Sequence, residues 1–312
     1  MRILITGGLG HIGSQLMRDL PGLLPGVEII VLDNLSTQRY CSLFNLPEGG
    51  KYRFLEGDVF TCNLDEVLEG VDAVIHLAAI TDAANSFDNR DRVELVNFDC
   101  TERIARACME RGCALIFLST TSVYGTQNDE VNENCTLDEL QPQSPYAESK
   151  LKAELMLKEL GKTEGLQSVT LRFGTIFGIS PGMRFHTAVN KFVWQACMGC
   201  PITVWRTAMD QKRPYLDLGD ATRALAFVIE RRIFDSETYN VLTINATVRE
   251  IVDAVRKQVD DVKVELVDTK IMNQLSYNVS RRKFENLGFT FTGKLEEGIA
   301  RSVALLKRAR SI

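Results

Sequence analysis

A glycine-rich turn close to the N-terminus places the strongest constraint on how this chain folds. Residues 2–6 form a short apolar run, and the segment Gly-Gly-Leu-Gly-His-Ile-Gly at 7–13 follows it directly and opens a helix-like stretch at 12–20. Glycines permit a tight turn and let backbone N–H groups at a helix N-terminus approach a pyrophosphate closely. The segment is therefore predicted to join a strand to a helix and to hold a dinucleotide.

An acidic residue at the end of the next apolar run indicates which dinucleotide binds. Asp33 lies twenty residues after Gly13, where a carboxylate can accept hydrogen bonds from the adenosine ribose hydroxyls. Because a carboxylate there repels a 2′-phosphate, NAD is favoured over NADP. Asp58, after a third apolar run, is a candidate contact for the adenine amino group.

The first half of the chain alternates short apolar runs with helix-like stretches, as expected for a parallel sheet covered by helices on both faces. The predicted fold class is α/β, with a Rossmann-like doubly wound parallel sheet. The apolar runs lie at 2–6, 28–32, 53–55, 73–77, 114–118 and 168–173, and the helical stretches lie at 12–20, 63–69, 92–111 and 147–160.

From about Gly178 the pattern changes to a mixture of helices and shorter strands. This predicts a smaller α/β lobe on the carboxyl edge of the main sheet, where ligands bind in doubly wound folds. We therefore divide the chain into a cofactor-binding domain at 1–177 and a mainly substrate-binding lobe at 178–312. The lobe's predicted helices lie at 184–198, 220–231, 247–259 and 294–309, and its strands lie at 202–205, 238–242 and 262–266.

Composition and net charge limit the kinds of molecule that the protein is expected to bind. The 312 residues are 45% hydrophobic and 25% charged with a net charge of -5, which suits a globular enzyme and gives no basic surface for nucleic acid. No apolar run could span a bilayer, and no signal peptide is recognisable. We expect a cytoplasmic protein whose eight cysteines are reduced thiols, with no metal site.

A hydroxyl pair and a lysine in the middle of the chain suggest proton transfer to or from an alcohol. Tyr146 and Lys150 are four residues apart and share one face of a predicted helix. A nearby cation would lower the pKa of the Tyr146 phenol, which is otherwise near 10. Thr120, at the end of a predicted strand, would orient the alcohol, so the three residues fit a proton relay for alcohol–ketone interconversion.

Taken in order, these motifs resemble those of the extended short-chain dehydrogenase/reductase superfamily, in its NAD-dependent nucleotide-sugar epimerase/dehydratase branch. The resemblance spans nearly the whole chain. Its markers are the segments at 6–13, 33–34, 57–59, 76–79, 119–125, 146–150, 171–173 and 213–215, together with Asn97.

The resemblance implies roles for individual residues. Thr120, Tyr146 and Lys150 would be the catalytic threonine, tyrosine and lysine, Asn97 would support the active-site end of its helix, and Phe173 would lie near the nicotinamide. The residues expected to contact NAD are Gly7, Gly10, His11, Ile12, Gly13, Asp33, Asn34, Asp58, Val59, Leu77, Ala78, Ala79, Thr81, Asn97, Tyr146, Lys150 and Phe173.

The two residues that follow Thr120 indicate which reaction of that branch to expect. The branch's 4,6-dehydratases carry Asp and Glu there, its decarboxylases keep a Glu at the second position, and its 3,5-epimerase–reductases place a Cys at about that position. This chain has Thr121 and Ser122, which cannot act as general acids or bases at neutral pH. Hydride transfer without further acid–base chemistry is therefore expected.

Several reactions remain open. In 4-epimerisation, Tyr146 removes the C4 hydroxyl proton, NAD takes the C4 hydride, and the 4-keto sugar turns and receives the hydride on its other face. Net dehydrogenation or reduction shares the first step, but its cofactor exchanges. A dehydratase, a decarboxylase or another epimerase with unusual acid–base residues is a further alternative, and a regulatory NAD-binding protein without catalysis is the non-enzymatic one.

Substrate contacts are also expected from the resemblance. Arg213 would reach the diphosphate of a nucleotide sugar, for which guanidinium geometry is well suited. Arg184 would meet the diphosphate or the carboxylate of a uronic acid. The full predicted set is Thr120, Thr121, Ser122, Thr175, Arg184, Asn190, Trp205 and Arg213.

The chain departs from the family's pattern in one further region. An arginine that the family places near the nucleotide is absent, and the region reads Met-Asn-Gln-Leu-Ser at 272–276.

The helices at 92–111 and 146–160 resemble a pair that forms a four-helix dimer interface in this branch, with Leu95, Ile104, Leu151 and Leu155 at helical spacings. A homodimer is therefore expected.

Overall fold

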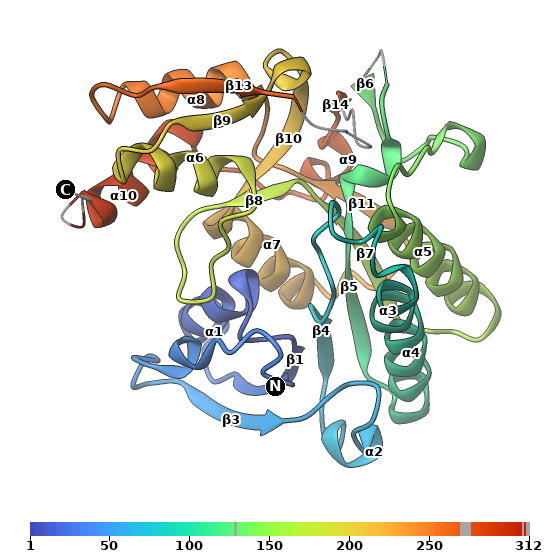
Figure 1. Cartoon of the computed structure of the whole chain (residues 1–312). Helices are drawn as coiled ribbons and strands as arrows, with labels where there is room; N and C mark the ends of the chain where they lie inside the picture. Colours follow the sequence, from blue (N-terminus) through green and yellow to red (C-terminus); the bar gives the residue numbers. More distant parts are fainter. Residues whose placement is uncertain (128–129, 269–275, 308, 310–312) are drawn as a thin grey trace.

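The computed structural model describes residues 1–127, 130–268, 276–307 and 309, so residues 272–275 lie outside it. In this part of the chain, seven parallel strands form the main sheet in the order β11-β7-β5-β4-β1-β2-β3 (Figure 1). The predicted fold class is confirmed. The strands are β1 (Arg2–Thr6), β2 (Glu28–Asp33), β3 (Lys51–Glu56), β4 (Ala73–His76), β5 (Ala114–Thr120), β7 (Ser168–Phe173) and β11 (Thr238–Val241).

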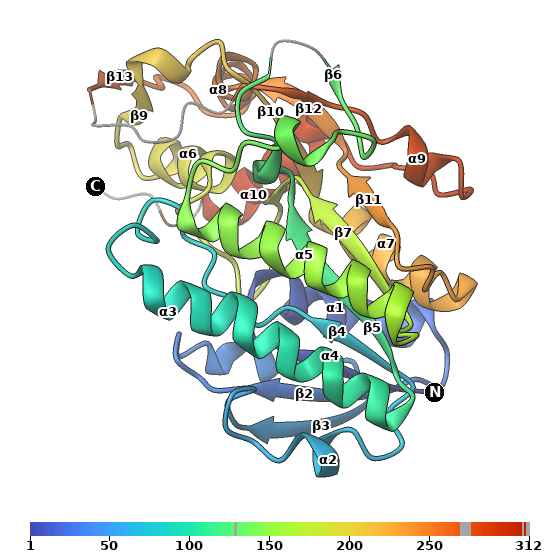
Figure 2. The same ribbon diagram turned by 90° about the vertical axis from the view of Figure 1, so that its right-hand side faces the viewer.

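Helices cover both faces of this sheet. On one face, α1 (His11–Leu23) and α7 (Leu218–Arg231) share a core with Ile3 and Ile5 of β1. On the other, α4 (Cys100–Arg111) and α5 (Pro145–Thr163) enclose the intervening Leu4 (Figure 2). Successive strand side chains point to opposite faces, so burial on both sides explains the continuous apolar runs. The short helices α2 (Leu64–Val67) and α3 (Arg90–Glu94) lie on the α4 side.

The rest of the chain forms smaller sheets and a separate core above the carboxyl edge of the main sheet. Its sheets join β8 (Thr175–Phe177), β10 (Lys212–Asp217) and β12 (Ile244–Thr247), β9 (Ile202–Trp205) with β13 (Val264–Val267), and β6 (Glu130–Val131) with β14 (Asn278–Val279). Its helices are α6 (Ala188–Cys197), α8 (Val248–Arg256), α9 (Arg282–Glu285) and α10 (Leu295–Leu306).

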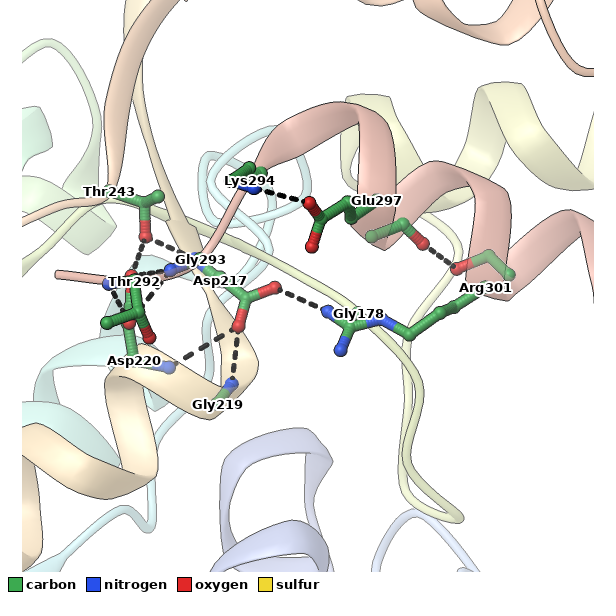
Figure 3. A network of polar contacts seen from close by, with 12 residues as sticks. Gly178, Asp217, Gly219, Asp220, Thr243, Thr292, Gly293, Lys294, Glu297 and Arg301 are labelled. Carbon is green, nitrogen blue, oxygen red and sulfur yellow. Dashed lines mark hydrogen bonds and ion pairs between the residues drawn. The ribbon is translucent and has the colours of Figure 1, made fainter.

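Two buried aspartates connect this smaller part to the main sheet. Asp217 caps α7 by accepting from Gly219 N at 2.9 Å, and it also binds Arg301 of α10 at 3.2 Å (Figure 3). Asp220 accepts the Thr243 hydroxyl at 2.7 Å and the Gly293 N–H at 3.0 Å. Carboxylates that accept several such bonds hold the C-terminal helix on α7.

Two sequence predictions about the smaller lobe were wrong. The strand predicted at 238–242 is β11, which pairs with β7 and completes the main sheet. A boundary at residue 177, which stays a prediction, would separate β11 and α7 from that sheet. The helix predicted at 184–198 begins only at Ala188, and the preceding segment bonds to α1 through Gly178, Ser180 and Gly182. None of the described helices is both long and apolar enough to cross a membrane.

Candidate active site

The predicted cofactor and catalytic residues gather at one edge of the main sheet. The turn at 7–13 follows β1, Asp33 ends β2, Asp58 follows β3, and Leu77 follows β4. Thr120 ends β5, and Phe173 ends β7 beside it in register. Because all these strands are parallel, their carboxyl ends meet at this edge, which is where ligands bind in doubly wound sheets.

The glycine-rich turn is packed so closely that side chains would not fit. Gly7 has φ +65°, and a Cβ there would lie 2.7 Å from Ala78 Cα. A Cβ on Gly13 would lie 2.5 Å from the Gly8 carbonyl oxygen. The helix α1 begins directly after Gly10, so its first free N–H groups face the edge at which the other strands end.

Replacing Gly13 with Ala is expected to disturb this turn. The new methyl group must displace the Gly8 carbonyl, so we expect at least a tenfold loss of NAD affinity and a destabilisation of about 1–3 kcal/mol. Gly22→Ala in the same helix is the control, because nothing lies within 4 Å of its Cβ position. Calorimetric NAD titration and thermal unfolding of both variants give the comparison. Equal NAD affinity in the two would exclude the turn as the pyrophosphate cradle.

The acidic residues predicted for the adenosine end are held in place by backbone and side-chain contacts. Asp33 accepts from Leu9 N at 3.0 Å and Leu35 N at 2.9 Å. Asn34 Nδ2 donates to Asp58 Oδ2 at 2.7 Å, which brings these two predicted cofactor residues together. Val59, next to Asp58, is buried in the adjoining core.

A buried polar network supports the loop after β4. The Asn97 amide donates to Ile80 O at 2.9 Å and accepts from Ile80 N at 2.8 Å, and it donates to Ser149 Oγ at 3.2 Å. Asn97 lies in η2 (Leu95–Asp99), a π-helical turn that interrupts the helix predicted at 92–111. Thr81 Oγ1, in the same loop, is buried without a hydrogen-bond partner among the described residues.

The catalytic candidates are brought together by a helix start and a short 3₁₀ turn. Ser144 Oγ accepts from Ala147 N at 3.2 Å and caps α5, with Pro145 in its first turn. This fixes Tyr146 opposite Thr120, where η3 (Thr121–Tyr124) begins. Burial raises the pKa of Tyr146, while its hydrogen bond with Thr120 and the charge of Arg184 lower it.

Lys150 occupies a different place from the one expected. Its ammonium donates to Leu118 O at 2.8 Å and lies 4.6 Å from the centroid of the Phe117 ring. Burial lowers the pKa of Lys150 to about 7, with a partly offsetting effect of Glu154. Arg184 rather than Lys150 is therefore the cation that lowers the pKa of Tyr146.

The buried lysine predicts a stability change with pH. An unfolded lysine titrates near 10.4, so between about pH 7 and 10 the unfolded chain binds more protons and stability rises with pH. Lys150→Met should remove this contribution, about 3 kcal/mol between roughly pH 7.5 and 9.5. His11 and His76, with pKa values lowered to about 4 and about 3, act only below this window. Denaturant unfolding of the original protein and of Lys150→Met, both nucleotide-free, gives the free energy of unfolding at each pH. If that free energy changed with pH equally in the two proteins, the prediction would be contradicted.

The predicted substrate residues lie on several elements above this edge. Thr121 Oγ1 donates to Phe173 O at 3.4 Å. Thr175 lies in β8 beside Tyr215, while Arg213 contacts Gln211 at 3.3 Å.

Two more predicted substrate residues, Trp205 and Asn190, have clear structural surroundings. Trp205 is half-buried at the end of β9, away from the main sheet. Asn190 contacts the backbone of the preceding loop, donating to Arg184 O at 3.0 Å and accepting from Gly178 N at 3.3 Å.

Two predicted cofactor residues in α1 contribute side chains to packing. His11 Nε2 lies 2.8 Å from Gly178 O, which requires the ring to donate, and burial lowers the pKa of His11 to about 4. Ile12 packs against the core below α1. Their backbone groups, at the start of the helix, remain the parts that could face a cofactor.

Sequence reasoning missed two residues near the site. Tyr277, just before β14, is buried with its hydroxyl 3.5 Å from Thr121 Oγ1, and no spacing in the sequence pointed to it. Arg39 follows Asp33 by six residues, and its Nη1 would lie 3.8 Å from a Cβ on Gly10. The position of the basic residue Arg39 soon after the acidic Asp33 was the sequence signal that could have identified it as a site residue.

The residues present fit a dinucleotide. The turn at 7–13 has no room for side chains, Thr81 has an unused buried hydroxyl, and Asp33 and Asn34 lie at the adjacent strand end. When bound there, NAD supplies the hydride acceptor and donor. The protein itself supplies the backbone N–H groups, the acidic edge and the neighbouring Thr120 and Tyr146 hydroxyls.

Comparisons with known proteins agree with this arrangement. The chain is 30% identical over 249 residues to an uncharacterized UDP-glucose epimerase, YtcB, of Bacillus subtilis (strain 168), covering 77% of this chain and 76% of that one. It is 28% identical over 315 residues to a trifunctional UDP-glucose 4,6-dehydratase/3,5-epimerase/reductase of Arabidopsis thaliana, covering 96% of this chain but only 46% of that longer protein.

Solved structures share the fold over almost the whole chain. A UDP-glucuronic acid 4-epimerase variant of Bacillus cereus, in complex with a UDP-4-deoxy-4-fluoro-glucuronic acid and NAD, superposes with a TM-score of 0.91 at 22% identity, covering 99% of this chain and 100% of that one. A UDP-glucose 4-epimerase of Thermus thermophilus with NAD gives 0.84 at 28% identity, with coverages of 99% and 100%.

A family model also matches most of the chain. Residues 3–241 match the NAD dependent epimerase/dehydratase family, a span that includes all of the main sheet except Arg2. The predicted family and the predicted cofactor are thereby confirmed. The chain belongs to the NAD dependent epimerase/dehydratase family of the extended short-chain dehydrogenase/reductases, and its cofactor is NAD.

Proposed function

We propose that the protein is an NAD-dependent nucleotide-sugar 4-epimerase that acts through a transient 4-keto intermediate. The observation that carries the proposal is the set of neutral hydroxyls at η3. The Thr120 hydroxyl interacts with Tyr146 and lies 3.1 Å from Ser122 Oγ, while Thr121 bonds to the Phe173 carbonyl. These groups suit removal and return of one hydroxyl proton, and none of them supplies the carboxylate that dehydration needs.

The proposed mechanism assigns the proton transfer to Tyr146. The Thr120 hydroxyl holds the C4 hydroxyl of the sugar against the phenol, and Tyr146 accepts its proton as the carbonyl forms. Tyr146 returns the proton when the hydride re-enters on the opposite face. Because burial raises the pKa of Tyr146, a nearby positive charge must offset that effect in the working enzyme. Lys150 and Arg184 are the candidate sources in the chain.

We further propose that the nucleotide sugar lies between η3 and the smaller part of the chain. Thr121, Ser122 and Thr175 would contact the sugar, and Arg213 would bind the diphosphate. Asn190 and Trp205 would border the nucleotide. The support is their position above the carboxyl edge of the main sheet, together with the bidentate geometry that guanidinium offers to phosphate.

Assembly and location belong to the same proposal. A homodimer would pair the α4 and α5 helices of two copies. Leu155 is 43% exposed on α5, whereas Ile104 is fully buried against the sheet. Of these two residues expected at the dimer interface, only Leu155 is therefore accessible to a second copy. Sedimentation showing only monomer at micromolar concentration would remove the dimer. Eight free thiols fit a reducing compartment such as the cytoplasm.

The deciding experiment is proton NMR of purified protein with UDP-, GDP-, CDP- and dTDP-linked hexoses, N-acetylhexosamines, uronic acids and heptoses. No cofactor is added. A new anomeric signal at constant total sugar is the expected result, and it would identify the substrate. Turnover only after stoichiometric addition of NAD or NADH would instead support net dehydrogenation or reduction and would reject epimerisation.

A further inference from the structure

A loop from the smaller part of the chain is fastened over the glycine-rich turn. Residues 178–184, here called the strap, run from β8 down to α1 (Figure 1). Ser14 Oγ donates to Ser180 Oγ at 3.0 Å and accepts from Gly182 N at 3.0 Å. Ser180 Oγ also lies 2.8 Å from His11 O. These buried bonds join two segments that are more than 160 residues apart in the sequence.

The strap touches the turn itself. A Cβ on Gly182 would lie 2.3 Å from Leu9 O and 2.5 Å from Gly10 O, so only glycine permits this approach. The carbonyls of the turn therefore face the strap. The end of the strap, at Arg184, is held in turn by Asn190 Nδ2, which donates to Arg184 O at 3.0 Å.

Two arginines converge where the strap meets the turn. Arg39 approaches from the loop after β2, with Nη1 3.8 Å from the Cβ position of Gly10. Burial and then the Arg39 charge lower the pKa of Arg184, so the charge of Arg39 is felt at Arg184. Arg184 Nε is buried and has no hydrogen-bond partner among the described residues.

The nearby carboxylates form no ion pair with these two arginines. Asp33 attracts Arg39, but its two oxygens accept from the N–H groups of Leu9 and Leu35. Asp82 attracts Arg184, but no ion pair joins Arg39 or Arg184 to an acid in the part of the chain that the structure describes. Two arginines at the glycine-rich turn, beside a helix N-terminus, favour the binding of an anion there.

We propose that Arg39 and Arg184 form a two-arginine clamp that holds the pyrophosphate of NAD against the glycine-rich turn. The turn supplies backbone N–H groups from one side, and the strap brings a guanidinium from the other. Arg184 thus serves the cofactor rather than the sugar. The inference depends on NAD as the cofactor and does not depend on the reaction proposed above.

The clamp has a consequence for cofactor release. NAD held in this way cannot leave until Arg184 and the strap move away from the turn. That movement must break the bonds of Ser14 to Ser180 and Gly182. Slow release suits an enzyme that regenerates its cofactor in every cycle, whereas exchange at each turnover would require the strap to open each time.

Binding measurements on Arg39→Gln and Arg184→Gln test the clamp without any substrate. Charcoal-treated, nucleotide-free protein is titrated calorimetrically with NAD, ADP-ribose and NADP. Each variant should bind NAD and ADP-ribose about 10- to 100-fold more weakly than the original protein. Lysine at either position should restore part of the affinity. Arg53→Gln, an exposed residue on β3, is the matched control and should change nothing.

Other outcomes would overturn the assignment. Unchanged NAD affinity in Arg184→Gln, with a raised KM for the nucleotide sugar identified by NMR, would return Arg184 to the substrate. A loss confined to NADP would show that the pair meets a 2′-phosphate. Thermal unfolding with and without NAD provides a second readout, because a variant that merely misfolds is destabilised under both conditions, whereas a clamp variant loses only the NAD-dependent increase.

Discussion

Tyr146→Phe is expected to lower kcat by about 10² to 10⁴-fold while leaving NAD affinity within about twofold of the original. The phenol interacts with Thr120, the residue just before η3, and Tyr146 lies in the capped first turn of α5. Phenylalanine keeps the ring and removes only the hydroxyl. The substrate therefore loses its base but the cofactor site keeps its shape.

The measurement is single-turnover NMR on the sugar identified with the original protein, together with NAD titration. Tyr52→Phe is the matched control, because its hydroxyl donates to Met17 O at 3.0 Å, away from the site. Retention of more than a tenth of the activity in Tyr146→Phe would exclude Tyr146 as the base. If a cellular response of the protein depended on NAD yet did not change in Tyr146→Phe, the regulatory alternative would be favoured instead.

The strands of the main sheet were predictable because burial on both faces leaves a clear record in the sequence. The apolar runs at 2–6, 28–32 and 114–118 lie in β1, β2 and β5. The strand β11 was also recognised as a strand but assigned to the wrong sheet. A four-residue strand carries no information about its neighbour, and only the pairing of β11 with β7 shows which sheet it belongs to.

The candidate site was predictable where the chemistry depends on local spacing. The turn at 7–13, Asp33 and the Tyr146–Lys150 pair are short motifs on one or two elements, and they meet at the carboxyl edge of the sheet. Tyr277 was missed because it reaches Thr121 from a distant segment. The direction of Lys150 was missed for a related reason, since the Leu118 carbonyl that receives its ammonium belongs to another element.

The strap was missed because nothing in residues 178–184 signals contact with α1. A helix was predicted to begin at residue 184, but the bonds of Ser14 to Ser180 and Gly182 and the close approach of Gly182 hold the strap against the turn. Contacts between segments so far apart in sequence depend on the complete fold. Local propensity therefore predicted the elements well, and their long-range partners poorly.

Glu154→Gln is expected to be among the most destabilising single changes in the chain. Arg172 Nε lies 3.0 Å and Nη2 lies 2.6 Å from the Glu154 carboxylate, and the two side chains are only 7% and 4% exposed. Burial alone would lower the pKa of Arg172, yet the carboxylate holds it above its usual value. Glutamine preserves the shape but leaves a buried guanidinium without a counter-ion.

The expected cost is about 3–5 kcal/mol, seen as a fall in Tm of roughly 5 to 10 °C. Glu159→Gln, exposed on the same helix, is the control and should shift Tm by less than about 1 °C. Removing the charge of Arg172 as well, in Glu154→Gln/Arg172→Met, should recover much of the loss because no unpaired charge remains buried. A double variant no more stable than Glu154→Gln would show that the loss comes from packing.

The same substitution links stability to the active site. Glu154 lies one helical turn after Lys150 and partly offsets the effect of burial on that residue's pKa. Without the carboxylate, the pKa of Lys150 should fall further, so the neutral amine would predominate at lower pH. The rise of stability with pH that Lys150 causes should then begin below about pH 7 in Glu154→Gln and remain absent in Lys150→Met. An unchanged onset would show that Arg172 fully screens Glu154 from Lys150.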